Sequence, residues 1–140
     1  ARDRAYMANK KEAKALADAK YRAANKESIK LKKQEYYNEN REKLLEDMKD
    51  IQKEDRKARF CCAIAAVFNE DKEIVAKGYI YGSIGFEEKG NNGFGYDSLF
   101  IVEESDGRTL AEISEEEKNK ISHRANALKE YKRLFENNIK

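Results

Sequence analysis

Two short motifs in the second half of this 140-residue chain combine residue types that could bind a ligand. The first is GNNGFGYD, residues 90–97, in which glycines surround Phe94 and in which Gly95, Tyr96 and Asp97 follow it. Glycine permits positive φ and a close approach of backbone to ligand, and an exposed aromatic ring offers a stacking surface. The motif lacks the spacing of a dinucleotide-binding fingerprint and the lysine of a P-loop. A ligand-binding loop and a tight turn before a buried strand therefore both stay open.

The second motif is EKNKISHR, residues 117–124, which places Lys118, Ser122, His123 and Arg124 near one another at helical spacing. A hydroxyl, a titratable imidazole and a fork of N–H donors on one turn suit hydrogen bonding to a base edge or a phosphate. The alternative is a helix surface with ordinary salt bridges. No Ser–His–Asp arrangement is implied, so the motif does not predict nucleophilic catalysis.

Metal binding is not predicted. Carboxylates bind the metal ions that assist phosphoryl transfer, but the acidic groups 87–88, 103–104 and 115–117 are interpreted as solvated or helix-capping. A zinc site is not expected either, because the chain has two cysteines and one histidine. Cys61 and Cys62 are neighbours in a predicted strand and point to opposite faces, so they should not pair. Unpaired cysteines favour a reducing, cytoplasmic setting.

Charge is distributed unevenly along the chain. The formal net charge of +2 combines +6 over residues 1–35 with −4 over residues 36–140. A basic start can suit nucleic acid, but mixed charge on a helix is usually a solvated surface, so nucleic acid is not the expected partner. With 40% charged residues and a mean hydropathy of −0.97, part of the chain should project into solvent or await a partner. No membrane span or signal peptide is evident, and a start at Ala1 suggests a fragment or a processed chain.

Residues 2–52 are predicted to form one or two long helices, because they contain no glycine or proline and are rich in strong helix formers. A 15-residue repeat places Tyr6, Tyr21 and Tyr36 on nearly the same helix face. The first two copies carry few large apolar residues, which indicates a solvated or partner-dependent helix, with a coiled-coil or nucleic-acid-binding arm as alternatives. The third copy carries an apolar stripe that could dock on a sheet. Its members are Leu44, Leu45, Met48 and Ile51.

Beyond residue 55 the pattern changes to strands and turns. The mixed-charge lead DRKARF, residues 55–60, is given a structural role. The first two strands should form an antiparallel hairpin. The predicted elements are a buried strand at 58–68, a turn at 69–72, a strand at 73–86, a loop at 87–93, a strand at 98–104 and a turn at 105–109.

The motif SEEE, residues 114–117, predicts a capping box in which Ser114 caps backbone amides and Glu117 reaches back. One helix should follow, with a single apolar face. That face comprises Ile121, Ala125, Leu128, Tyr131 and Phe135. A sheet packed by a C-terminal helix predicts an α/β (α+β) fold class.

Taken in order, these motifs resemble the inosine triphosphate pyrophosphatase family, also called XTP/dITP diphosphatases. The matching stretches are NREKLLEDM, EDRKARFCCAIA, GSIGFEEKGNNGFGYDSLF and RTLAEISEEEKNKISHRANALKEY, which lie within residues 40–131. The resemblance implies that residues 40–140 form the C-terminal portion of such a protein, with a mixed sheet and a groove between two lobes. Residues 1–39 are then a separate basic helical segment.

The resemblance also implies an activity. Family members cut ITP, dITP and XTP to the monophosphate and pyrophosphate with Mg²⁺, and they are commonly dimers, which implies a homodimer here. Stacking accepts any purine, so donors that meet the 6-oxo group must select the base. By resemblance, Phe94 stacks on the purine, Gly95, Tyr96 and Asp97 complete that wall, Lys118 binds substrate, and Ser122, His123 and Arg124 read the base edge.

The chain also departs from the family's pattern. It has no Thr/Ser-x-Asn-x-x-Lys phosphate loop, no counterpart of the metal-binding glutamate and no SDDSGL-type motif with its general base, and Ser98 stands where a proline is usual. We therefore identify no catalytic residue and no Mg²⁺ ligand, and expect the isolated chain to be weakly active or inactive. The alternative is a non-catalytic purine-nucleotide-binding or dimerisation module with a helical, nucleic-acid-binding arm.

Overall fold

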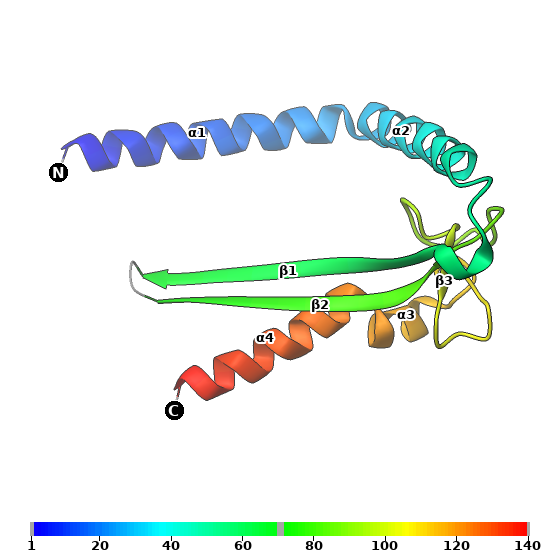
Figure 1. Ribbon diagram of the computed structural model, residues 1–140. Coiled ribbons are helices and arrows are strands. Elements are labelled where there is room, and N and C mark those ends of the chain that lie inside the picture. The colour runs from blue at the N-terminus through cyan, green and yellow to red at the C-terminus, as the bar shows by residue number, and fades with distance from the viewer. Residues whose placement is uncertain (1, 70–71, 140) are drawn as a thin grey trace. The chain divides into compact units, whose positions relative to one another are not determined.

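The computed structural model describes residues 2–69 and 72–139, and it divides the chain into two units, 1–40 and 41–140. The predicted long helices are confirmed as α1 (Arg2–Ala24) and α2 (Lys26–Asp47), which are drawn in Figure 1. A turn at Asn25 separates the two helices.

The 15-residue repeat forms an exposed surface on these helices. Tyr6, Tyr21 and Tyr36 are 67%, 64% and 59% exposed. Asn25 and Asn40 each donate a side-chain hydrogen bond to the carbonyl of the tyrosine four residues earlier, at 2.8 and 2.6 Å. The repeat therefore builds no core, as predicted. In the third copy, which was expected to be able to dock on a sheet, burial is only partial. Leu44, Leu45 and Met48 are half-buried, and Ile51 is exposed.

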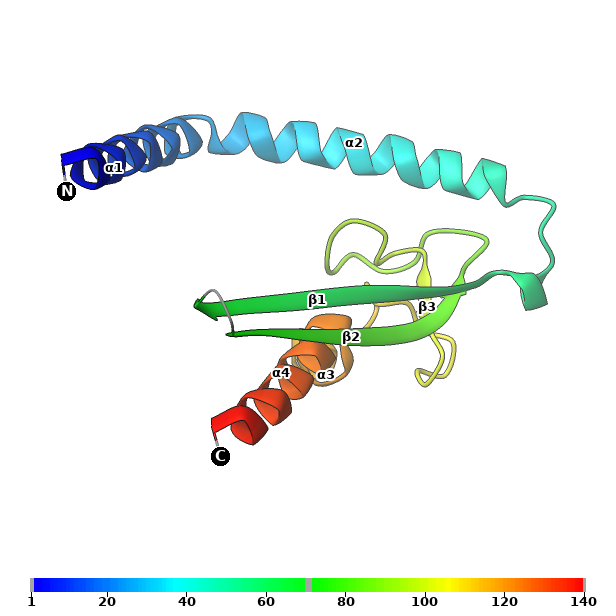
Figure 2. The same ribbon diagram turned by 60° about the vertical axis from the view of Figure 1, so that its left-hand side comes forward.

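Strands β1 (Lys57–Asn69) and β2 (Lys72–Ile84) form the predicted antiparallel hairpin, with Phe60 opposite Ile80. A single 3₁₀ turn, η1 (Lys53–Asp55), precedes β1. The predicted turn at 69–72 includes residues 70 and 71, which lie outside the described residues. Both Figure 1 and Figure 2 show the helix α4 (His123–Ile139) lying against this hairpin.

The prediction that β1 is a buried strand is wrong. Its side chains alternate between half-buried and exposed, and none is fully buried. Helix α4 packs on the hairpin, and apolar side chains such as Val67 are nevertheless left exposed. An apolar run can form a strand with one open face, because strand side chains alternate between the two faces. Cys61 is exposed, Cys62 is half-buried, and both are free thiols, as predicted.

Strand β3 (Phe100–Val102) is much shorter than the predicted strand at 98–104. The amides of Leu99 and Phe100 both donate to the Tyr96 carbonyl, so the chain curls just before the strand, and a turn follows Val102. The described strands form one sheet in the order β1-β2-β3, with antiparallel pairing throughout. This part of the molecule therefore lacks the parallel pairs that the implied mixed sheet would require.

The predicted single C-terminal helix is also wrong. Helix α3 (Glu115–Ile121) ends at Ser122, whose extended ψ of 155° breaks the helix before α4 begins. The break shifts the face of α4 that is buried. Ala127 is fully buried, whereas Leu128, assigned to the core from its spacing, is 59% exposed. The other predicted members of the face are half-buried: Ile121, Ala125, Tyr131 and Phe135.

Close backbone packing at Gly78 fixes α4 on the hairpin. A Cβ atom at Gly78 would lie 2.0 Å from the Ala127 backbone nitrogen, so no larger residue fits without movement of the helix. The Asn126 side-chain amide also donates to the Tyr79 carbonyl at 2.8 Å. The main core cluster lies beside this contact and comprises Ile80, Phe100, Val102, Leu110 and Ile113. A sheet packed against a C-terminal helix confirms the predicted α/β (α+β) class.

Candidate functional site

A pocket of ≈ 520 Å³ lies where the two sequence motifs meet. Its volume falls in the range of small-molecule binding sites. The pocket is formed by the glycine loop (residues 87–98) and by the helix junction (residues 118–124), where α3 gives way to α4. The lining residues are Asn92, Gly93, Phe94, Ile113, Glu115, Lys118, Asn119, Ser122, His123, Arg124, Ala125 and Leu128.

Phe94 presents a largely open aromatic ring in the glycine loop. The residue is 55% exposed, and its backbone amide donates to Asp97 Oδ2 at 2.9 Å. Asp97 itself is buried. Gly93 comes just before, with φ +88°, and a Cβ atom there would lie 2.3 Å from the Asp97 carboxylate. Only glycine therefore allows Asp97 to reach across the turn and hold Phe94 in place.

An ion pair joins the two walls of the pocket. Lys118 Nζ lies 2.6 Å from Asp97 Oδ2, and the two side chains are only 17% and 10% exposed. The same ammonium group lies 5.8 Å from the centroid of the Phe94 ring. Asp97 thus orients both the loop and the lysine, and Lys118 keeps further N–H donors for a ligand.

Ser122 builds the helix junction. Its backbone amide donates to the Lys118 carbonyl at 2.9 Å, which closes α3, and its Oγ accepts from the Ala125 amide at 3.2 Å, which caps α4. These two bonds set the turn after which His123 and Arg124 line the pocket. The guanidinium carbon of Arg124 lies 4.9 Å from the Phe94 ring centroid, a cation–π distance. Two cationic groups therefore face one aromatic ring.

His123 is held as a neutral imidazole. Its ring stacks on Phe60 at 5.2 Å, and among the described residues its buried Nδ1 has no hydrogen-bond partner. Burial, followed by the positive charge of Arg124, lowers the pKa of His123 below its ordinary 6.5. Asp97 acts in the opposite direction but does not outweigh them. Because Nδ1 is buried, only the other ring nitrogen of the neutral imidazole is left to act toward a ligand, as a donor or as an acceptor.

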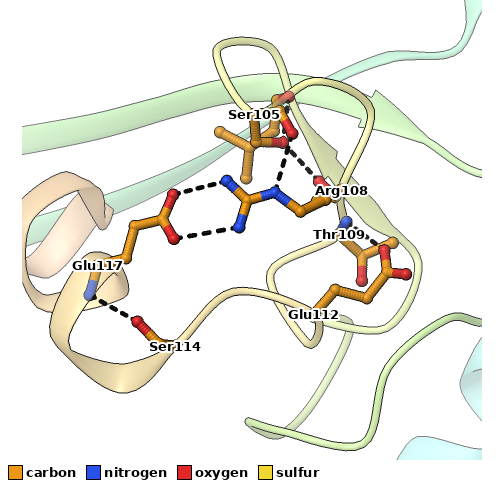
Figure 3. Close-up of polar contacts among 7 residues, drawn as sticks. Ser105, Arg108, Thr109, Glu112, Ser114 and Glu117 are labelled. Atoms are coloured by element: carbon orange, nitrogen blue, oxygen red, sulfur yellow. Dashed lines mark hydrogen bonds and ion pairs between the residues drawn. The ribbon is translucent and has the colours of Figure 1, made fainter.

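A bidentate ion pair holds the start of α3, as Figure 3 shows. Arg108 donates from both terminal nitrogens to the two carboxylate oxygens of Glu117, at 3.1 and 2.8 Å. Ser114 caps the Glu117 amide at 3.2 Å, as predicted. The other half of the predicted capping box is wrong, because the Glu117 carboxylate binds Arg108 instead of reaching back. This clamp fixes the helix that carries Lys118.

Two buried residues support the site although neither was predicted as a site residue. Thr109 is fully buried, and its hydroxyl donates to the Lys89 carbonyl at 2.8 Å, which anchors the glycine loop. Arg56 is 1% exposed and donates to the carbonyls of Ile84 and Gly85 at 2.9 and 2.7 Å, just before that loop. These bonds agree with the structural role expected for residues 55–60. The sequence carries no local signal for them, since the partners lie 20 to 29 residues away.

The structure brings most of the predicted site residues together. Five of them line the pocket: Phe94, Lys118, Ser122, His123 and Arg124. Asp97 lies behind it as the anchor described above. Gly95 and Tyr96 do not belong to the lining, and both have structural contacts through their carbonyls, with Arg41 for Gly95 and with Leu99 and Phe100 for Tyr96.

Three of the glutamates near the pocket form ion pairs, whereas among the described residues no ion pair is seen for Glu115, which lines it. Glu87 pairs with Lys89, Glu88 with Arg41, and Glu117 with Arg108. Over residues 2–69 and 72–139 no three His, Cys, Asp or Glu side chains gather into a possible metal site. Over the same residues, no helix has the length and apolar character needed to cross a membrane.

Comparison with protein families matches residues 10–134 to the Ham1 family. The match extends into α1 and α2, beyond the residues 40–131 that carry the sequence motifs. The chain is 47% identical over 94 residues to the dITP/XTP pyrophosphatase of Bacillus subtilis (strain 168), an alignment that covers 67% of this chain and 47% of that protein. It is 48% identical over 97 residues to the dITP/XTP pyrophosphatase of Clostridium tetani, covering 69% and 47%.

The fold has counterparts among solved structures. The structure of the Staphylococcus aureus Ham1 protein superposes with a TM-score of 0.67 and 36% identity, covering 73% of this chain and 52% of that one. In all these comparisons the chain spans about half the length of the relatives it matches.

Proposed function

Because the chain belongs to the Ham1 family, we propose that its pocket binds the base of a deaminated purine nucleoside triphosphate: ITP, dITP or XTP. One observation carries the proposal. The exposed ring of Phe94 and the donors of Lys118, Ser122 and Arg124 converge on one pocket of ≈ 520 Å³. The names of the relatives, dITP/XTP pyrophosphatases, support the same substrate class.

The chemistry of the pocket favours a 6-oxo purine over adenine. Phe94 can stack on any purine, so the ring gives affinity without selectivity. Lys118 and Arg124 carry donors only, and they can meet the carbonyl oxygen of hypoxanthine or xanthine. The 6-amino group of adenine is itself a donor, so a cation placed at the 6-position would meet no acceptor there. N7 accepts in both kinds of purine, so the discrimination rests on the 6-position. The same positive charges attract the phosphates of the nucleotide.

The proposed reaction of the complete family protein is hydrolysis to the nucleoside monophosphate and pyrophosphate, with Mg²⁺ as the expected cofactor. Among the described residues no three His, Cys, Asp or Glu side chains gather into a metal site, and we identify no Mg²⁺ ligand among them. They also offer no general base that we can name. We therefore propose that this chain supplies base recognition and has little or no pyrophosphatase activity alone.

Three further features of the proposed protein rest on the sequence and the family resemblance. Residues 40–140 act as the C-terminal portion of a pyrophosphatase, and residues 1–39 act as a separate basic segment. The protein forms a homodimer. It resides in the cytoplasm, where the free thiols of Cys61 and Cys62 stay reduced.

Calorimetric titration of the purified chain with ITP and with ATP tests the proposal. We expect ITP to bind at least about tenfold more tightly than ATP, because donors placed at the 6-position find an acceptor in hypoxanthine and none there in adenine. Equal affinities, or no binding of ITP, would contradict base recognition. A pyrophosphate-release assay with ITP and Mg²⁺ should show little turnover, and ready release would show that the chain carries catalytic groups of its own.

A second function is favoured by the basic composition of residues 1–35, whose net charge is +6, and by the exposure of most side chains in residues 6–35. In this alternative the chain is a non-catalytic nucleotide-binding or dimerisation module whose helical arm contacts nucleic acid. A short DNA duplex, titrated at low and at physiological salt, distinguishes the two. Duplex binding that weakens steeply with salt would support the arm, because phosphate contacts release counterions.

A further inference from the structure

The glycine loop needs contacts from other segments to hold one conformation. Gly90, Gly93 and Gly95 all have positive φ, and the chain contains no proline that could stiffen the loop. Glycine loses more backbone entropy on ordering than any other residue. One set of tethers comes from residues 109–111. The Thr109 hydroxyl donates to the Lys89 carbonyl, the Ala111 carbonyl accepts from the Asn92 amide, and the Ala111 amide donates to the Asp97 carbonyl. None of these contacts reaches the Gly95 carbonyl, which lies one residue beyond Phe94.

A second tether does reach that carbonyl. Arg41, the first residue of the 41–140 unit, donates from Nη1 to the Gly95 carbonyl at 2.8 Å and from Nε to Glu88 Oε2, also at 2.8 Å. Ser98 Oγ donates to the same glutamate oxygen at 2.8 Å. The Arg41 guanidinium therefore links Glu88, near the start of the glycine loop, to Gly95 further along it. Glu88 in turn links this pair to Ser98, at the end of the loop.

This cluster differs from an ordinary surface salt bridge. The Arg41 side chain is only 17% exposed, and one of its acceptors is a backbone carbonyl. Exposed pairs contribute little because water screens them, whereas a charge-assisted bond in a partly buried position is stronger. The planar guanidinium also fixes the directions of its donors, so two acceptors in different parts of a loop are held at a set separation. A lysine has no such fork.

We propose that Arg41 is a positioning residue for the base-stacking wall, acting through Glu88 and the Gly95 carbonyl to hold the Phe94 ring at the pocket. Phe94 immediately precedes Gly95, so a shift of that carbonyl changes the course of the backbone next to the ring. The inference rests on the proposed function, in which Phe94 stacks on a purine. The order of the loop, however, can be measured without any nucleotide.

Amide hydrogen exchange, resolved by residue with NMR, tests the proposal in the full chain. In Arg41→Leu the amides of Phe94 and Asp97 should exchange about tenfold faster, the loss expected for one charge-assisted hydrogen bond. Amides of β1 and β2 should exchange at the wild-type rate. Arg41→Lys should lie between wild type and Arg41→Leu, because lysine keeps the charge but cannot bridge both acceptors.

Arg133→Leu is the matched control. Arg133 also forms a two-bond pair with a glutamate, Glu130, at 2.9 and 2.6 Å, but on an exposed part of α4. This variant should leave exchange in the glycine loop unchanged. Unchanged exchange in Arg41→Leu would overturn the proposal, as would an equal rise in β1 and β2, which would indicate a loss of global stability instead.

Titration with ITP supplies the second readout. Affinity should fall about three- to tenfold in Arg41→Leu and less in Arg41→Lys, the range expected for partial loss of a preorganised wall. Unchanged ITP affinity in a variant whose loop exchanges faster would overturn the positioning role. If the wild-type chain binds no ITP, the proposed function fails on its own, and the exchange measurement still decides whether Arg41 orders the loop.

Discussion

The two walls of the pocket are held in place by different forces. The glycine loop depends on directed polar contacts: the Asp97 bonds to Phe94 and Lys118, and the Arg41 bonds to Gly95. The helix junction has polar contacts of its own, the Ser122 cap and the Arg108–Glu117 pair, but it depends in addition on packing, because the backbone of α4 meets β2 at Gly78. The pocket therefore combines a packed wall, the helix junction, which carries the donors, with a second wall, the glycine loop, in which a few hydrogen bonds position the aromatic ring.

This difference separates folding from ligand binding. Core packing contributes to the stability of the whole unit, so changes that disturb α4 should unfold the protein. Contacts to an exposed ring contribute little to stability, so changes there should alter affinity while the fold survives. Variants of the helix junction and of the glycine loop should therefore differ in whether they lower stability or ligand affinity.

The largest effect is expected for Gly78→Val. The added side chain would collide with the backbone of α4, since a Cβ atom alone lies 2.0 Å from Ala127 N and 2.3 Å from the His123 carbonyl oxygen. Backbone cannot give way as a flexible side chain can, so the free energy of unfolding should fall by more than about 4 kcal/mol. Urea unfolding followed by circular dichroism measures the change.

Ala63→Val is the control for Gly78→Val. Ala63 lies opposite Lys77 in the same hairpin, on an exposed position of β1. Because a β-branched residue fits an exposed strand position, the unfolding free energy should change by no more than about 0.5 kcal/mol. A similar loss of unfolding free energy in the two variants would mean that the packing of α4 against Gly78 does not hold the helix junction in place.

A smaller effect, on binding alone, is expected for Phe94→Ala. Loss of the stacking surface should weaken ITP binding by about 1–3 kcal/mol. The unfolding midpoint should stay unchanged, because the residue is 55% exposed. Calorimetry and urea unfolding on the same preparation measure both quantities. Tyr21→Ala removes an aromatic residue that is 64% exposed in α1, and it should change neither. An unaltered ITP affinity in Phe94→Ala would show that the ring does not stack on the base and belongs to a structural turn instead.

The smallest effect concerns the pH dependence of stability through His123. Burial and the charge of Arg124 lower the pKa of His123 in the folded state, with Lys118 acting in the same direction and Asp97 opposing. As pH falls through 6.5, the unfolded chain takes up this proton before the folded protein does. The contribution of His123 to stability is therefore fully present above pH 6.5 and is lost as pH falls from there toward the lowered pKa of the folded state.

Urea midpoints measured from about pH 7.5 down to about pH 5.5 test this sign, because protein carboxylates mostly titrate lower. His123→Gln should lose part of the decrease, since glutamine does not titrate. An identical pH dependence in wild type and His123→Gln would show that His123 ionises equally easily in the folded and unfolded states.

The elements that the sequence predicted well are those whose evidence is local. Helix-forming composition placed α1 and α2, and two apolar segments with a turn-like segment between them placed the β1–β2 hairpin. Motif content also singled out Phe94 and residues 118–124, and these segments do line one pocket. Their assignment to base recognition stays a prediction until nucleotide binding is measured.

The errors arose where a long-range contact competes with a local preference. The helix expected to be continuous breaks at Ser122, and Glu117 leaves its capping position because Arg108 offers a better partner. The open face of β1 could not be read from its apolar run, because the run does not say on how many faces a strand is covered.

The amino-acid sequence by itself determined which segments carry ligand-binding residue types and which family they resemble, since both depend on residue types at short, recognisable spacings. The support of the pocket is a property of the folded chain. Arg41 reaches Gly95 across 54 residues, Lys118 reaches Asp97 across 21, and Arg56 reaches Gly85 across 29. No local pattern encodes such pairs, because each depends on where the sheet and helices bring distant backbone together.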